Sequence, residues 1–170
     1  MTQSQKIVAI GAASGVAAML LSMVVLYRLL PHAAPYAGLA DRLAYAAVAN
    51  AFASLPLLAA IGAIGNARAL SDAIDPTLGK ESPAMIVNGR VVDNTLQQFV
   101  LFATATLALS VNLKPAQLHV LAAAAIVFVV ARLLFWIGYR IDPLYRAFGF
   151  AATIYLNLGL LAAALWLAMR

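Results

Sequence analysis

Charged residues divide this chain of 170 residues into five long uncharged stretches. These stretches span residues 7–27, 43–67, 94–113, 115–131 and 147–169. A helix that crosses a bilayer needs about 20 mainly apolar residues, and all but the fourth stretch reach that length. The fourth continues through Arg132 into LLFWIGY, which predicts a helix from about 116 to 140. The pattern therefore predicts an all-α integral membrane protein with five transmembrane helices.

The composition agrees with a membrane protein and excludes several chemistries. Hydrophobic residues make up 65% of the chain and charged residues 10%, whereas soluble domains are about 45–50% apolar and roughly 25% charged. The absence of cysteine excludes disulfides, thiolate metal sites and a cysteine nucleophile. The net charge of +5 comes from basic residues that bracket apolar segments, which indicates membrane topology and no nucleic-acid partner. His32 and His119 are isolated, so we expect both at the membrane interface and no metal site.

The first uncharged stretch is longer than the apolar region of a signal peptide. We therefore expect a retained helix, with a cleaved signal as the alternative. We divide the chain into residues 1–42, a transmembrane helix with its connecting loop, and residues 43–170, a four-helix domain whose long loop covers 68–93. An N-terminus inside the cell would leave six basic residues on the cytoplasmic side: Lys6, Arg68, Lys80, Arg90, Arg140 and Arg146. The other side would receive Arg28, Arg42, Lys114 and Arg170, so the bias favours a cytoplasmic N-terminus and long loop.

Small residues and one proline suggest how the helices pack. Gly11 and Gly15 form a GxxxG pattern, which allows helix backbones to approach closely. Pro56 lies inside the second apolar stretch, where it either kinks the helix or is simply tolerated.

Two polar stripes lead into the apolar stretches. Arg90, Asn94 and Gln97 share one helix face, and Asp93 lies one turn before Gln97. Arg132 lies seven residues before Tyr139, so these side chains also share a face. A charge such as that of Arg132, well inside an apolar segment, is costly unless it is paired or hydrated. We expect the two stripes to face one another across a cleft, although polar residues at helix ends also snorkel or cap helices.

Both stripes resemble the signature of the membrane-associated proteins in eicosanoid and glutathione metabolism, the MAPEG family. That family includes the microsomal glutathione transferases. Its pattern of Arg, three residues, Asn, two residues and Glu corresponds here to R-VVD-N-TL-Q, and its second element corresponds to ARLLFWIGYRIDPLYR. The resemblance covers roughly residues 43 to 169. It implies a MAPEG-like four-helix bundle, to which residues 1–30 add an N-terminal helix, as in a bacterial-type member.

The resemblance implies a homotrimer of the bacterial inner membrane that binds glutathione between subunits on the cytoplasmic side. It would conjugate or reduce lipophilic electrophiles with glutathione as co-substrate. The positions that hold the tripeptide correspond here to Arg90, Asn94, Gln97, Arg132 and Tyr139. Arg146 matches the arginine that stabilises the thiolate, and Arg68 matches a second basic residue near the active site.

Two departures from the family pattern weaken the case for catalysis. Gln97 stands where the pattern has Glu, and Phe135 stands where some catalytic members carry Tyr. The sequence therefore leaves open whether the chain is an enzyme. The alternatives are a non-catalytic MAPEG-like protein that binds lipid or a partner protein, and a small transporter or channel subunit. The last is disfavoured because no acidic residue lies inside an apolar stretch.

Overall fold

The computed structural model describes residues 1–31 and 38–170, and all regular structure within them is helical. The prediction of an all-α protein is confirmed for these residues. The long helices are α1 (Gln3–Leu29), α2 (Leu39–Ala53), α3 (Leu55–Ala69), α4 (Pro83–Asn112), α5 (His119–Ile141) and α6 (Arg146–Ala168). Two short 3-10 turns, η1 (Pro76–Leu78) and η2 (Pro115–Gln117), lie in the connections before α4 and α5.

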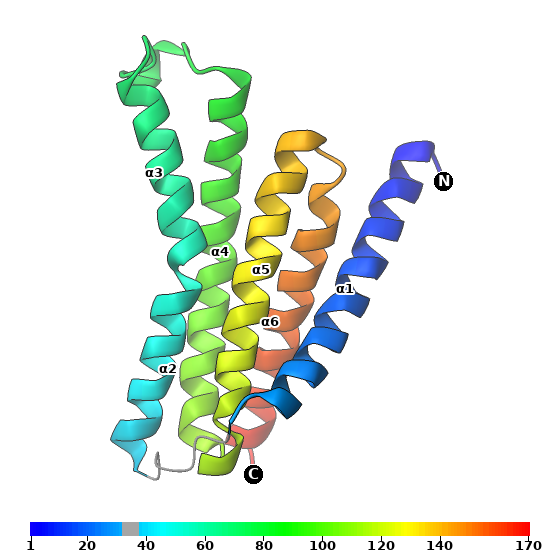
Figure 1. The fold of residues 1–170 in the computed structure, drawn as a ribbon, viewed down its shortest axis with the longest axis vertical. Helices are drawn as coiled ribbons and strands as arrows, with labels where there is room; N and C mark the ends of the chain where they lie inside the picture. Colours follow the sequence, from blue (N-terminus) through cyan, green and yellow to red (C-terminus); the bar gives the residue numbers. More distant parts are fainter. Residues whose placement is uncertain (32–37) are drawn as a thin grey trace.

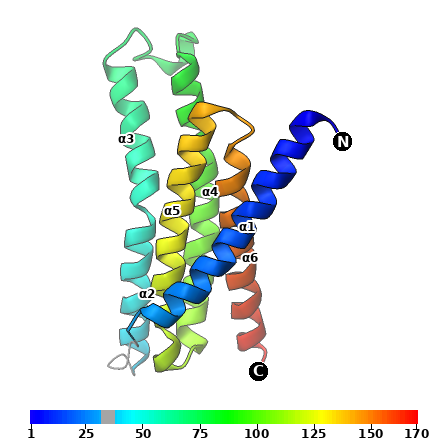
Figure 2. The ribbon, with the colours of Figure 1, turned by 45° about the vertical axis from the view of Figure 1, so that its right-hand side comes forward.

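Helices α2 and α3 follow one another end to end and form one long rod of the bundle (Figure 1). This rod packs against α4 and α5, and α4 and α5 both pack against α6. Helix α1 lies outside these four rods and crosses α6 and α5 obliquely (Figure 2). The two chain ends lie at opposite ends of the bundle, with the N-terminus at the same end as the α5–α6 turn (Figure 1).

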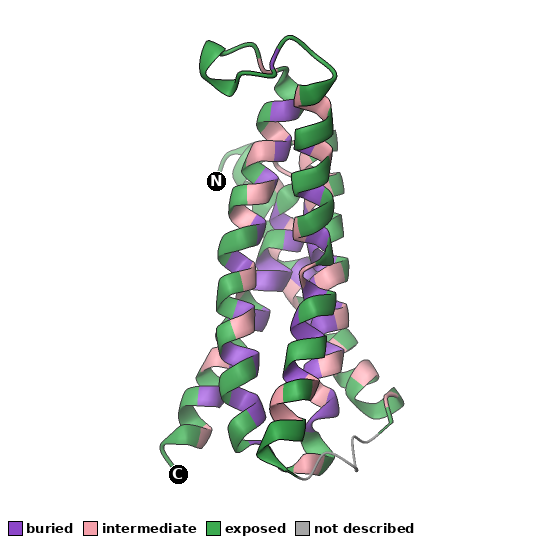
Figure 3. Ribbon diagram, turned by 90° about the vertical axis from the view of Figure 1, so that its left-hand side faces the viewer, coloured by how far each residue is buried: buried purple, intermediate pink, exposed green. Residues whose placement is uncertain are grey.

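The outer surface of the bundle is apolar, as expected where lipid replaces water. Figure 3 shows exposed residues along the outer helix faces and buried residues between the helices. Large apolar side chains such as Leu21, Leu58 and Ile137 are exposed in the described part of the chain. By length and composition, four segments could cross a membrane: α1, α2 with α3, α5 with its preceding turn, and α6. Helix α4 has 30 residues, but the polar stripe lowers its hydropathy, so the chain is an integral membrane protein with four or five candidate spans.

The rod of α2 and α3 is interrupted at Ser54, just before Pro56. Proline has no backbone N–H, so it cannot continue the hydrogen-bond ladder of the preceding turn. At this interruption the hydroxyl of Ser54 donates to the carbonyl of Ala51 at 2.7 Å. Of the two sequence alternatives for Pro56, the structure supports the kink.

The connection between α3 and α4 is shorter than the loop predicted over 68–93. Helix α3 continues to Ala69, and α4 begins at Pro83. The hydroxyl of Ser82 caps α4 by accepting from the N–H of Met85, and proline is well tolerated in the first helical turn. Charge and proline suggested a loop here, whereas the Ser-Pro pair is in fact a helix start. Arg90 and Asp93 therefore lie on a rigid helix.

Of the two histidines expected at the membrane interface, the structure describes His119. His119 is completely buried, and its ring lies 4.3 Å from that of Tyr27 on α1, measured between centroids. Helix α1 thus covers the start of α5. His32 lies outside the described residues.

The two glycines of the GxxxG pattern face the first turns of α6. A Cβ added at Gly15 would overlap the carbonyl oxygen of Phe148, and one added at Gly11 would touch the Cβ of Ala147 at 3.4 Å. These glycines allow α1 to contact the backbone of α6 directly. The small-residue packing expected from the sequence is therefore present at this contact.

Candidate functional site

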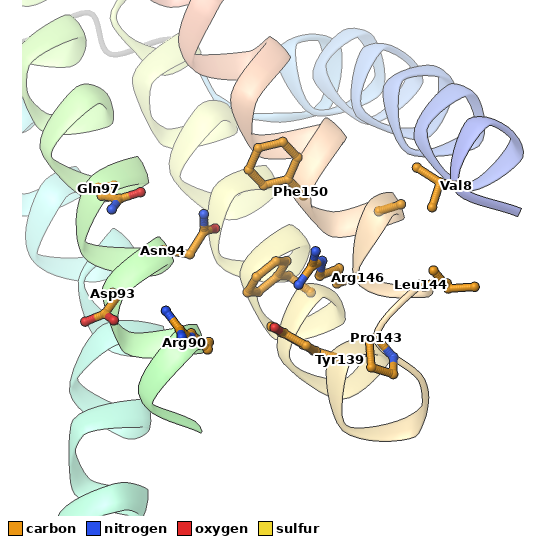
Figure 4. Close-up of a pocket in the computed structure, with 12 residues that line it drawn as sticks. Val8, Arg90, Asp93, Asn94, Gln97, Tyr139, Pro143, Leu144, Arg146 and Phe150 are labelled. Atoms are coloured by element: carbon orange, nitrogen blue, oxygen red, sulfur yellow. The ribbon is translucent and has the colours of Figure 1, made fainter. Parts of the chain in front are cut away.

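A cleft of about 490 Å³ opens near the end of the bundle that carries the N-terminus and the α5–α6 turn. Figure 4 shows side chains from α4 on one side, α5 and α6 beyond them, and α1 at the far edge. The polar lining residues are Arg90, Asp93, Asn94, Gln97, Tyr139 and Arg146. The apolar lining residues are Val8, Phe135, Pro143, Leu144, Ala147 and Phe150. Its volume falls within the range of about 300–1,000 Å³ usual for small-molecule sites.

Helix α4 supplies four of the six polar side chains. Arg90, Asn94 and Gln97 recur at the i, i+4, i+7 spacing of one helix face, and Asp93 borders the same face. Arg90, Asp93 and Gln97 are exposed, and Asn94 is half-buried. The stripe read from the sequence therefore forms one wall of the cleft.

The end of α5 and the start of α6 supply the facing polar groups. The guanidinium carbon of Arg146 lies 4.7 Å from the ring centroid of Tyr139, within the range of a cation–π contact. Tyr139 in turn meets Phe135 edge to face, with 5.8 Å between ring centroids. These aromatic rings form the floor of the cleft and support Arg146 above it. Of the second predicted stripe, Tyr139 therefore faces the α4 stripe across the cleft.

Arg132 lies behind the cleft and not in its lining. Its side chain is only 1% exposed, so it does not snorkel to the membrane surface. One terminal nitrogen donates to Thr153 at 3.1 Å, and the other donates to Asn94 at 3.0 Å and to Thr95 at 3.1 Å. The guanidinium carbon also lies 3.9 Å from the ring centroid of Phe135. Hydrogen bonds to three oxygens and contact with a ring face stabilise this intramembrane charge in the absence of an acidic partner among the described residues.

The hydrogen bond from Arg132 determines what Asn94 offers to the cleft. The side-chain oxygen of Asn94 accepts from the guanidinium. Its amide nitrogen therefore remains as a donor toward the cleft. Arg132 orients a lining residue, and through Phe135 it also supports the aromatic floor.

Arg68 lies outside the cleft of its own chain. It lies in the last turn of α3 and forms an ion pair at 2.6 Å with Glu81, just before α4 begins. Within residues 1–31 and 38–170 this is the one ion pair, so Arg90 and Arg146 are not neutralised by a carboxylate in contact with them. The cleft therefore contains two guanidinium groups and one carboxylate, that of Asp93. This excess of positive charge favours an anionic ligand.

Sequence reasoning missed several residues that build or support the site. Thr153 lies seven residues after Arg146, so the helical period places both on the same face of α6, with Thr153 two turns deeper than Arg146. Thr95 could have been found as the neighbour of Asn94. Val8 carries no such signal, because it is one apolar residue in an apolar segment.

Comparison with known proteins is consistent with this arrangement. The model of the MAPEG family matches residues 43–166, which include both stripes and the four-rod bundle but not α1. No curated protein and no solved structure matches the chain. The family match extends over most of the chain, and we conclude that this integral membrane protein belongs to the MAPEG family.

Proposed function

We propose that the protein binds glutathione in the cleft and uses its thiol to conjugate or reduce lipophilic electrophiles. The observation that carries this proposal is the convergence of Arg90, Asn94, Tyr139 and Arg146 from three helices around one cleft with an excess of guanidinium groups. Membership in a family of glutathione and eicosanoid metabolism supports the choice of ligand.

The charges of glutathione suit the groups in the cleft. The tripeptide has two carboxylates and one ammonium group, and arginine binds carboxylates with two parallel hydrogen bonds. Arg90 is the exposed guanidinium of the α4 wall, and the amide of Asn94 is available beside it. Gln97 offers the ammonium group a neutral acceptor in place of the family's glutamate. Asp93 lines the same cleft one turn away and supplies a carboxylate for that role.

Arg146 is the group proposed to activate the thiol. A guanidinium near a thiol lowers its pKa, and the thiolate is the nucleophile. In a conjugation the sulfur forms a bond to carbon, the leaving group departs with its electron pair, and the thiol proton goes to solvent. In the reduction of a hydroperoxide, two glutathione molecules become one disulfide while the peroxide becomes an alcohol and water.

We further propose five crossings, with the N-terminus and the cleft on the cytoplasmic side of the bacterial inner membrane. The bias of basic residues supports this orientation. The 30 residues of α4 are enough for a fifth span at about 1.5 Å per residue. We also propose a homotrimer, which the family resemblance supports. In that assembly Arg68, which does not reach its own cleft, would approach the site of a neighbouring subunit.

Titration of glutathione against the purified protein in mild detergent tests the proposal. We expect binding at millimolar concentration or below, and Arg90→Ala should weaken it about tenfold or more, because bonds to charged groups contribute about 1.5–3 kcal/mol. Arg146→Ala should reduce the ultraviolet absorbance of the bound thiolate. The matched control is Arg140→Ala. Arg140 is an exposed arginine in the last turn of α5 that does not line the cleft.

Absence of any glutathione binding by the native chain would refute the assignment. The non-catalytic alternative, a MAPEG-like protein that binds lipid or a partner protein, would then be favoured. Equal losses in the Arg140 and Arg90 variants would show that bulk positive charge, and not the cleft, attracts the ligand.

A further inference from the structure

The two walls of the cleft differ in chemistry. The α4 wall presents Arg90, Asp93, Asn94 and Gln97. The opposite wall presents Val8, Leu144, Ala147 and Phe150, which are all apolar (Figure 4). Arg146 lies between the walls, above the ring of Tyr139. A ligand with a charged half and an apolar half, joined near Arg146, would match this arrangement.

Helix α1 completes the apolar wall. Val8, Gly11 and Gly15 lie on one face of α1 by their i, i+3, i+7 spacing. Gly15 allows the backbone of α1 to meet the carbonyl of Phe148, and Gly11 meets Ala147, which immediately follows Arg146. This contact fixes the position of Val8 relative to the proposed thiolate site. Val8 is 39% exposed and lines the cleft, so a change in side-chain volume at position 8 changes the space next to that site.

Val8 lies outside the segment that matches the family, which begins at residue 43. The apolar wall in this chain is therefore built in part by a helix that the four-helix family bundle does not supply. We propose that α1 and the start of α6 form the subsite for the apolar group of the electrophile, and that Val8 sets the length and bulk accepted there. This inference rests on the proposed function, since the charged half of the ligand is taken to be glutathione.

A series of S-alkyl glutathiones tests the subsite without requiring turnover. The probes are S-methyl, S-butyl and S-hexyl glutathione, titrated against full-length protein in lipid nanodiscs, with empty nanodiscs measuring partition of the alkyl chain into lipid. Burial of one methylene contributes about 0.8 kcal/mol, or about fourfold in affinity when complete. Because the cleft is open, the alkyl chain is only partly buried there. We therefore expect the S-hexyl probe to bind at least about tenfold more tightly than the S-methyl probe.

Substitutions at Val8 should change this preference selectively. Val8→Trp fills the apolar wall, so the S-hexyl advantage should fall below about threefold while S-methyl affinity changes less than about twofold. Val8→Ala keeps the space open and should retain most of the advantage. The matched control is Val24→Trp on the same helix, where the side chain is 55% exposed and does not line the cleft. This control should keep the native preference.

Three results would overturn the proposal, and they are distinguishable. An S-hexyl advantage that survives unchanged in Val8→Trp would show that the alkyl chain lies elsewhere, while the glutathione assignment stands. Equal weakening of both probes by Val8→Trp would place Val8 against the tripeptide half. Failure of S-methyl glutathione to bind the native protein would refute the proposed function itself, and the subsite with it.

Discussion

Replacement of Arg132 by methionine should separate the stability of the bundle from ligand binding. Methionine is long, flexible and apolar, so it fills much of the volume of the arginine without the charge. The change removes hydrogen bonds to Asn94, Thr95 and Thr153. The hydroxyl of Thr153 still donates to the carbonyls of Gly149 and Phe150, so it keeps hydrogen-bond partners.

Two opposing effects determine the expected change in stability. Hydrogen bonds between membrane helices contribute about 0.6 kcal/mol each on average, so three of them contribute about 2 kcal/mol. Removal of a buried charge lowers the desolvation cost, and replacement of buried ionic groups by apolar ones is often neutral or stabilising by about 1–4 kcal/mol. These terms nearly cancel. We therefore expect the free energy of unfolding to change by less than about 2 kcal/mol.

Ligand binding has no such compensation. Without Arg132 the amide of Asn94 loses the bond that orients it, and the positive potential behind the cleft disappears. A hydrogen bond to a charged ligand contributes about 1.5–3 kcal/mol, so glutathione affinity should fall by roughly tenfold to a hundredfold.

The assay combines two measurements on Arg132→Met: glutathione titration and reversible unfolding in mixed micelles. Thr153→Val is the control, since it removes one partner of Arg132 and leaves the bond to Asn94 in place. It should bind glutathione within about threefold of the native protein, because the orienting bond is retained. If Arg132→Met unfolds much more easily but binds glutathione normally, Arg132 is a structural residue and the reasoning about Asn94 is wrong.

The other predictions concern the ammonium site, topology and assembly. Gln97→Glu should tighten glutathione binding about tenfold, because charge assistance roughly doubles the strength of a hydrogen bond. Asp93→Asn should weaken glutathione binding. If neither variant differs from the native protein in a glutathione titration, the ammonium group is not bound here. One-sided reporters fused to the two termini should give opposite signals, and equal signals would eliminate an odd number of crossings. Native mass spectrometry in mild detergent should show three chains, whereas a stable monomer would exclude a site shared between subunits.

Much of the site could be predicted because its signals are local. The spacing of Arg90, Asn94 and Gln97 places them on one face of any regular helix, whatever packs against it. The kink at Pro56 follows from a missing backbone donor, which is also a local property. The start of α4 at Pro83 differs from the predicted loop, because charge and proline are typical of loops but here follow a capping serine, Ser82.

The helical membrane fold and the two polar faces follow from the sequence, since both depend on hydropathy and on a fixed helical period. Three contacts are visible only once the helices are packed: Val8 borders the cleft, Thr153 partners Arg132 and His119 is buried under α1. In a bilayer an apolar side chain has a similar free energy against lipid and against another helix, so hydropathy does not show which helix face is packed. Those contacts depend on where backbones can approach, as at Gly15 and Phe148, and that is a property of helix pairs and not of either segment alone.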